Sequence, residues 1–181
     1  MVSQMKVMVK RLIMWILAIS SAFILGIYLD YNVLKFVFPI YVKILGVIGI
    51  IISFRMLQVS GRTLKKYGMA DEWGWTTKLV KTGIYSCIRH PHHFGIGIFT
   101  SSLTLIIGGI NTFIISSVVI WILIVWFLKS VDEPELLEKF GDEYIKYRGE
   151  VPMIVPRLKC LLKELYRGVK QIFTSPSNML L

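Results

Sequence analysis

Four long apolar runs constrain this chain more than any other feature of its sequence. A helix needs about 20 apolar residues, at 1.5 Å each, to cross a bilayer. The first two runs reach that length, and the last two are predicted to form a tight hairpin because Gly108 and Gly109 separate them. The four runs cover residues 12–29, 36–54, 94–107 and 112–128.

With 55% hydrophobic and only 18% charged residues in 181, the chain has more apolar surface than a small soluble domain can bury. The expected fold class is therefore an all-α polytopic membrane protein. It has about four transmembrane segments, the last two forming the helical hairpin, and a cytoplasmic helical cap follows them.

The basic residues lie mainly beside the apolar runs. With four spans, all but Lys35 and Lys43 of the 21 Lys and Arg residues fall on one side of the membrane. The positive-inside rule identifies that side as the cytoplasm, so both termini and the long loop at 55–89 are predicted to face it. The net charge of +10 then suits anionic membrane lipids, and we expect no nucleic-acid binding.

The segments outside the runs are predicted to carry the cytoplasmic part. Helical spacing predicts a helix over Asp132–Tyr147 and an amphipathic helix on the inner leaflet over 158–172. The long loop holds an acidic and aromatic cluster at 71–75. We divide the chain into N-terminal membrane helices with the start of that loop (1–77), a core (78–156) and an amphipathic tail (157–181).

Cys87 and Cys160 are far apart and form no Cys-x-x-Cys motif, so no structural zinc site is indicated. In a reducing cytosol we expect two free thiols.

Two polar clusters stand at the predicted membrane boundary, where polar residues are costly. One, at 83–95, contains Arg89 and three histidines, and the other is Lys129 to Glu133. The hairpin returns the chain, so both clusters are expected on the same side.

Each cluster also has a simpler interpretation. Arg89 could serve topology alone, His92 and His93 could be interfacial anchors, and the two acids could begin a helix. A metal site is not expected, because the spacing of His90 and His92 does not place them on one helical face. None of these interpretations explains why acids and bases gather on both sides of one hairpin.

The residues Arg89, His90, Pro91 and Gly95 resemble the Arg-His-Pro-x-Tyr-x-Gly signature of the isoprenylcysteine carboxyl methyltransferase and phospholipid methyltransferase superfamily. The sequence DEPELLEKFGDEYIKY, from Asp132, is similar to the family's Glu-Glu-x-x-Leu-x-x-x-Phe-Gly-x-x-Tyr-x-x-Tyr pattern, and VPMIVP resembles its Val-Pro-x-x-x-Pro ending. The resemblance covers 78–156. His93 replaces the tyrosine of the signature and Asp132 the first glutamate, and Lys129 is the cation nearest to a family arginine.

The resemblance implies an integral membrane methyltransferase that uses S-adenosylmethionine on a lipidic or lipid-linked acceptor, most like the isoprenylcysteine carboxyl methyltransferases. A carboxylate acceptor needs a positioning cation, whereas an amine or thiol needs a base. The catalytic candidates are Arg89, Lys129 and Glu133. The cofactor-binding candidates are Lys78, Leu79, Val80, Tyr85, His90, Pro91, His93, Asp132 and Glu133.

Several alternatives stay open. Within the family, the chain could be a phospholipid N-methyltransferase or a thiol S-methyltransferase. Outside it, the chain could be an NADPH-dependent enzyme like the sterol reductases, or a non-catalytic membrane adaptor whose basic surface binds anionic lipids. The expected partners are a lipidic or prenylated substrate and membrane lipids.

Overall fold

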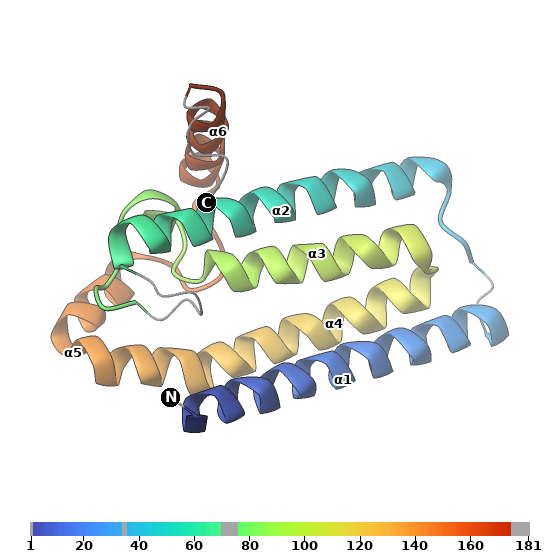
Figure 1. The fold of residues 1–181 in the computed structure, drawn as a ribbon. Helices are drawn as coiled ribbons and strands as arrows, with labels where there is room; N and C mark the ends of the chain where they lie inside the picture. The colour runs from blue at the N-terminus through green and yellow to red at the C-terminus, as the bar shows by residue number, and fades with distance from the viewer. Residues whose placement is uncertain (1, 34–35, 70–75, 175–181) are drawn as a thin grey trace. The chain divides into compact units, whose positions relative to one another are not determined.

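The computed structural model describes residues 2–33, 36–69 and 76–174, in which the regular elements are helical (Figure 1). Within those ranges, β geometry is confined to an isolated bridge between Val37 and Gly109. The all-α class predicted from the sequence is confirmed. The elements are α1 (Val2–Asn32), α2 (Ile40–Gly68), the short turn η1 (Gly83–Ser86), α3 (Pro91–Ile107), α4 (Ile110–Phe127), the π-helical turn η2 (Leu128–Asp132), α5 (Glu133–Glu150) and α6 (Leu158–Thr174).

Three helical stretches in the described ranges are long and apolar enough to cross a bilayer. They are Ile13–Asn32 of α1, Ile40–Gly68, and Ile110–Glu150, which begins with α4. The remaining predicted span, the third in sequence order, is α3, which has 17 residues and is about 26 Å long, slightly less than a hydrocarbon core of about 30 Å. The chain is therefore an integral membrane protein with three helices of spanning length.

The long loop predicted from residue 55 is shorter in the structure. Helix α2 does not end with its apolar run but continues to Gly68. Ser53, Met56 and Ser60 are fully buried at helical spacing, so packing extends this helix beyond its hydrophobic part. The acidic and aromatic cluster at 71–75 lies outside the described residues.

The chain forms two compact units, each made of separate stretches of sequence. The first unit contains residues 1–51 and 97–126, and the second contains 52–96 and 127–181. This division differs in kind from the three consecutive segments proposed from the sequence, because helices α2 and α3 each contribute to both units.

In the first unit, Asp30 joins the end of α1 to the start of α4. Its carboxylate accepts hydrogen bonds from the backbone N–H groups of Gly109 (2.7 Å), Asn111 (2.9 Å) and Thr112 (3.2 Å). These N–H groups lie at the start of α4, where the backbone N–H groups of a helix have no hydrogen-bond partners within the helix. Asp30 thus caps α4 and holds the turn between α3 and α4.

Small residues allow the helices of this unit to approach closely. A Cβ atom on Gly26 would lie 2.5 Å from Cα of Thr112, and one on Gly49 would overlap the Ser102 side chain. Such packing of small residues is typical of helices in membranes, where close backbone approach supplies much of the attraction.

In the second unit, the aromatic residues of α5 build a core. Tyr144, Tyr147 and Val151 are buried together, and partly buried apolar side chains pack around them. Gly141 has a positive φ of 51° inside α5, a conformation that glycine adopts at little cost, and it kinks the helix there. The surrounding side chains are Leu79, Leu136 and Phe140.

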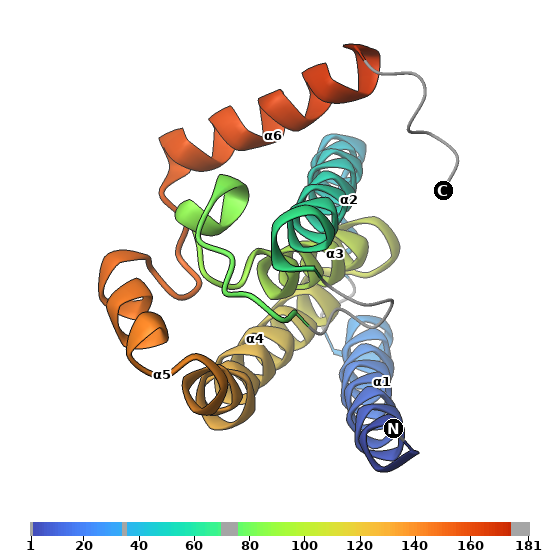
Figure 2. The same cartoon turned by 60° about the vertical axis from the view of Figure 1, so that its left-hand side comes forward.

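The expectation of two free thiols is wrong for this structure. Cys87 and Cys160 form a disulfide, with their Cα atoms 5.5 Å apart and a sequence separation of 73. This bond attaches α6 to the chain just after η1, and Figure 2 shows the two elements next to each other. Sequence spacing could not reveal the pair, because only the fold brings the two cysteines together.

Candidate active site

The loop that carries the first polar cluster is held in a fixed turn. Gly83 begins η1 with a positive φ of 61°, and Pro91 occupies the first position of α3. A proline there costs no hydrogen bond, because the first N–H groups of a helix have no internal partner. His90 therefore directly precedes the helix, and its backbone carbonyl accepts a hydrogen bond from the N–H of Phe94 (3.1 Å).

The second polar cluster is placed by the π-helical turn η2 between α4 and α5. Pro134 has no N–H to donate to the carbonyl four residues before it. The hydrogen-bond ladder shifts, and the N–H of Glu133 bonds to the carbonyl of Leu128, five residues back. Single π turns inside helices are often found at functional sites. The predicted helix start at Asp132 is thus the last residue of a π turn, and α5 begins at Glu133.

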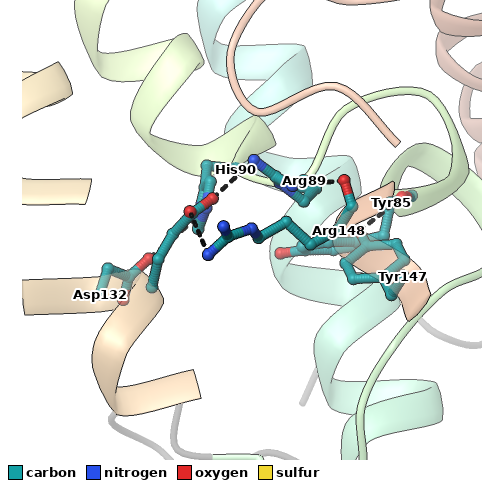
Figure 3. A network of polar contacts seen from close by, with 7 residues as sticks. Tyr85, Arg89, His90, Asp132, Tyr147 and Arg148 are labelled. Carbon is teal, nitrogen blue, oxygen red and sulfur yellow. Dashed lines mark hydrogen bonds and ion pairs between the residues drawn. The ribbon is translucent and has the colours of Figure 1, made fainter. Parts of the chain in front are cut away.

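These two segments meet in a network of buried charges (Figure 3). The Glu133 carboxylate lies 2.7 Å from Nη2 of Arg89, and both side chains are almost fully buried. His90 contacts both acids, with Nδ1 2.9 Å from Asp132 and Nε2 3.4 Å from Glu133. Arg148, from the end of α5, lies 4.0 Å from the other oxygen of Glu133.

The network favours the protonated form of His90. Burial lowers the pKa of an imidazole, but hydrogen bonds and the negative charges of Asp132 and Glu133 outweigh this effect, so the pKa of His90 is raised above its ordinary value of 6.5. With His90 protonated, three cations face two carboxylates in the network. In that protonation state the network carries one more positive than negative charge.

The end of α5 and the segment after it hold this loop in place. Arg89 donates its backbone N–H to the carbonyl of Pro152 (2.9 Å), and Arg157 donates to the carbonyl of Cys87 (3.1 Å). The Tyr147 hydroxyl donates to the carbonyl of Tyr85 (2.7 Å). The Arg89 guanidinium also donates from Nη1 to the carbonyl of Arg148 (2.8 Å).

A small cavity of about 60 Å³ adjoins the network. Two polar atoms at this cavity, Arg89 Nε and the Tyr144 hydroxyl, are buried without a hydrogen-bond partner among the described residues. Burial raises the pKa of Tyr85 far above its usual range, so this phenol stays protonated. The lining consists of Leu64, Thr76, Leu79, Val80, Tyr85, Arg89, His90, Leu136, Phe140, Tyr144 and Tyr147.

The structure brings most of the predicted site residues together. Leu79, Val80, Tyr85, Arg89 and His90 line the cavity. Asp132 and Glu133 contact His90 from the other side.

The remaining predicted residues lie around or outside this cavity. Pro91 is fully buried beneath the network, and the His93 ring lies 6.1 Å from that of His90 and 5.5 Å from that of Phe127. Lys78 and Lys129 are exposed and do not line the cavity.

Sequence reasoning overlooked several residues of the site. Arg148 belongs to none of the motifs, and the signal for it in the sequence was its position one helical turn after Tyr144. Phe140, Tyr144 and Tyr147 belonged to the family pattern but were not assigned to the site, although their spacing puts them on one face of α5.

For a possible metal site, the relevant pair of histidines is His90 and His93, not the pair His90 and His92 considered from the sequence. His90, His93 and Asp132 each offer one atom of a type that binds metal ions, and these atoms lie within 4.8 Å of one another. His92 is exposed, and the histidine that joins this group is His93, three residues after His90. In this structure, Nδ1 of His90 bonds directly to the Asp132 carboxylate.

Comparisons with known proteins agree on one family. The model of the phospholipid methyltransferase family matches residues 34–143. A protein-S-isoprenylcysteine O-methyltransferase from Schizosaccharomyces pombe is 32% identical over 80 residues, which is 43% of this chain and 33% of that protein. One from Saccharomyces cerevisiae is 37% identical over 82 residues, 43% of this chain and 32% of that protein. The chain spans about a third of the length of these curated relatives. No solved structure matches it.

Proposed function

Because this chain belongs to the phospholipid methyltransferase family, we propose that it is an integral membrane enzyme that transfers a methyl group from S-adenosylmethionine to a lipidic or lipid-linked acceptor. The observation that carries the proposal is the buried network of Arg89, His90, Asp132 and Glu133 beside an aromatic cavity. Buried charges are costly, and a network of this kind at a cavity is typical of functional sites.

The residues at the cavity suit this cofactor. Tyr85, Phe140 and Tyr144 offer apolar and aromatic surface for an adenine ring, and Arg89 Nε and the Tyr144 hydroxyl are buried polar groups with hydrogen bonds to give. The cavity of about 60 Å³ is smaller than the cofactor, so binding requires the lining side chains to move apart. When bound, the cofactor supplies a methyl group on a sulfonium, and transfer to oxygen forms a C–O bond as the C–S bond breaks.

The two acids take a different role from the one that the family resemblance implied. Both carboxylates already contact cations of the protein, so we assign them to holding Arg89 and His90. Arg89 keeps one donor, Nε, without a hydrogen-bond partner among the described residues, and this donor can bind a negative group. Correct placement of reacting groups is the main contribution that a protein makes to a displacement of this type.

The charge of the network favours a carboxylate acceptor. A carboxylate is ionised at neutral pH and needs only a cation to position it, which the Arg89 guanidinium can supply. An amine or a thiol must lose a proton to a base. Asp132 and Glu133 are the acids at this network, and both are occupied by His90 and Arg89. This supports a reaction like that of the isoprenylcysteine O-methyltransferases over phospholipid N-methylation.

Orientation follows from the sequence. We propose that both termini and the site face the cytoplasm, because nearly all Lys and Arg residues lie on that side with four spans.

Two measurements test the function. Thermal unfolding of the purified chain should shift upward with S-adenosylmethionine and stay unchanged with NADPH. A shift with NADPH alone would indicate a reductase, and no shift with either would indicate an adaptor.

Candidate acceptors are then compared by incubating each one with the protein and a labelled methyl donor. We expect label in a prenylated cysteine with a free carboxylate, and none in its methyl ester, which differs only by the blocked oxygen. Label in phosphatidylethanolamine instead would support the N-methyltransferase alternative.

A further inference from the structure

Over residues 158–167, where the structure describes the side chains, helix α6 packs on the rest of the second unit by one side. Cys160 forms the disulfide with Cys87, and Leu161 beside it is 6% exposed. Glu164, one turn further along, lies near Gly83 of η1 and is partly buried. The inward side of the helix is thus defined by residues 160, 161 and 164.

An apolar stripe runs along another side of α6. Leu158, Leu162 and Tyr166 are 67%, 66% and 71% exposed. They are four residues apart, so their side chains line up along the helix. The sequence predicted an amphipathic helix over 158–172, in which Leu158 and Leu161 stand at helical spacing. The structure separates them, because Leu161 packs against the protein while Leu158 does not.

A cationic stripe lies directly beside the apolar one. Lys159, Lys163 and Arg167 are exposed and are also four residues apart, each one position after a residue of the apolar stripe. Arg167 pairs with Glu164 at 2.8 Å. Within the described part of the chain, Lys159 and Lys163 have no ion pair, and this segment holds no acid other than Glu164.

We propose that the outward side of α6 docks on the surface of an anionic lipid bilayer. The apolar stripe would enter the boundary between headgroups and acyl chains, and the cationic stripe would contact lipid phosphates and carboxylates, as in other interfacial helices. Lys and Arg stems can lie along apolar surface while their charged ends reach the headgroups.

The arrangement of charge on α6 supports an anionic lipid bilayer as its binding partner. A soluble protein partner would need a matching acidic and apolar surface, whereas anionic headgroups offer a continuous field of negative charge. The chain is anchored in a bilayer by its own helices, so α6 meets that surface at high effective concentration. The proposal concerns this surface alone and does not depend on the proposed methyl transfer.

Amide hydrogen exchange of the full chain in lipid nanodiscs tests the docking. We compare discs of phosphatidylcholine with discs that also contain phosphatidylserine, and follow peptides that cover 158–167. A docked helix exchanges more slowly, so phosphatidylserine should slow exchange there, and high salt should reverse the effect. Peptides of α5 report whether the fold is intact.

Matched variants distinguish the effect of the α6 lysines from the effect of a lower net charge. Lys159→Gln with Lys163→Gln should weaken docking about 30-fold, since each lysine near an anionic surface contributes about fivefold. Lys65→Gln with Lys146→Gln removes the same charge from other exposed positions and should leave α6 protected. Leu162→Ser should raise exchange of α6 in both kinds of disc.

Three results would overturn the proposal. They are equal exchange of α6 with and without phosphatidylserine, unchanged protection in the Lys159 and Lys163 variant, and an equal loss in the control pair. If a variant alters exchange in α5 as well, the single change Lys163→Gln compared with Lys146→Gln repeats the test, and equal protection in these two would count against docking.

Discussion

At the scale of single residues, His90 differs from the other two histidines by its burial. Its side chain is 5% exposed and lies between two carboxylates, whereas His92 is exposed. The proline that follows limits the backbone of His90 and starts the next helix. The sequence motif therefore presents one imidazole rigidly to the network.

Replacing His90 should separate a positioned residue from an interfacial anchor. We expect His90→Ala to lower methyl transfer at least about 100-fold, because small displacements of reacting groups have effects of this size. His92→Ala should keep most of the activity, since its side chain is exposed. Turnover with a labelled donor measures both, in protein shown by gel filtration to be folded. Similar activity in the two variants would contradict the assignment.

Glu133 is expected to matter for stability as well as for function. Glu133→Gln leaves the buried Arg89 cation without its partner at 2.7 Å, and breaking a buried pair in this way costs about 3–5 kcal/mol. Glu138→Gln makes the same chemical change on an exposed position of α5 and should be nearly neutral. Thermal unfolding in detergent compares them, and an unchanged melting temperature for Glu133→Gln would show that the pair is not formed.

The His90 network also predicts how stability depends on pH. The pKa of His90 is raised in the folded state from an ordinary value of 6.5. Its protonated ring therefore contributes stability that is fully present below pH 6.5 and is lost as pH rises through the folded pKa. Melting temperatures measured upward from pH 6 should fall across this window, and less so for His90→Gln. An identical pH profile for that variant would rule out the contribution.

At the scale of elements, the site depends on how segments are joined. Asp132 ends the π turn η2 and Glu133 follows it at the start of α5, and the segment after α5 holds the histidine loop through backbone hydrogen bonds to Arg89 and Cys87. The disulfide adds a covalent link from the same loop to α6. The loop is thus fixed from the C-terminal side of the chain, which lies more than 60 residues away in sequence.

The disulfide can be tested by counting thiols. In protein purified without reductant and unfolded, we expect no alkylated cysteine before reduction and two after it. Reduction should also speed amide exchange in 157–167, because α6 loses its link to η1. In the chain-entropy model, a loop of this length stabilises the folded state by about 4 kcal/mol at most. Two alkylated thiols before reduction would support the original expectation of free cysteines.

At the scale of the whole molecule, insertion in the membrane is the main constraint on the fold. Among the described residues, three helical stretches have the length and composition of spans, and most basic residues lie beyond the apolar runs in these stretches. The helix ends in the first unit are joined by the Asp30 carboxylate, which satisfies N–H groups that would otherwise lack partners.

Reporter fusions test the orientation. If the positive-inside rule holds with four spans, reporters that are active only in the cytoplasm should work at both ends of the chain. A fusion inside the turn at 108–111 should be inactive, which provides the internal control. Activity at only one end would mean an odd number of crossings, and the site would then need to be placed again.

The sequence by itself determined the class of fold, the helices and the residue types of the site. Apolar runs and helical spacing are local properties, so α4 and α6 could be predicted closely, whereas α1 begins ten residues before its apolar run. Arg89, His90, Asp132 and Glu133 of the network could be named because the family motifs occur in the same order in this chain, whereas Arg148 lies in no motif.

Tertiary structure alone decided which groups touch. It buried His90 and left Lys129 exposed, paired Glu133 with Arg89, and joined Cys87 to Cys160. It also extended α2 to Gly68 through buried contacts that no hydropathy pattern contains. Each of these features depends on segments tens of residues apart, and their burial and charge are set by neighbours that only the folded chain supplies.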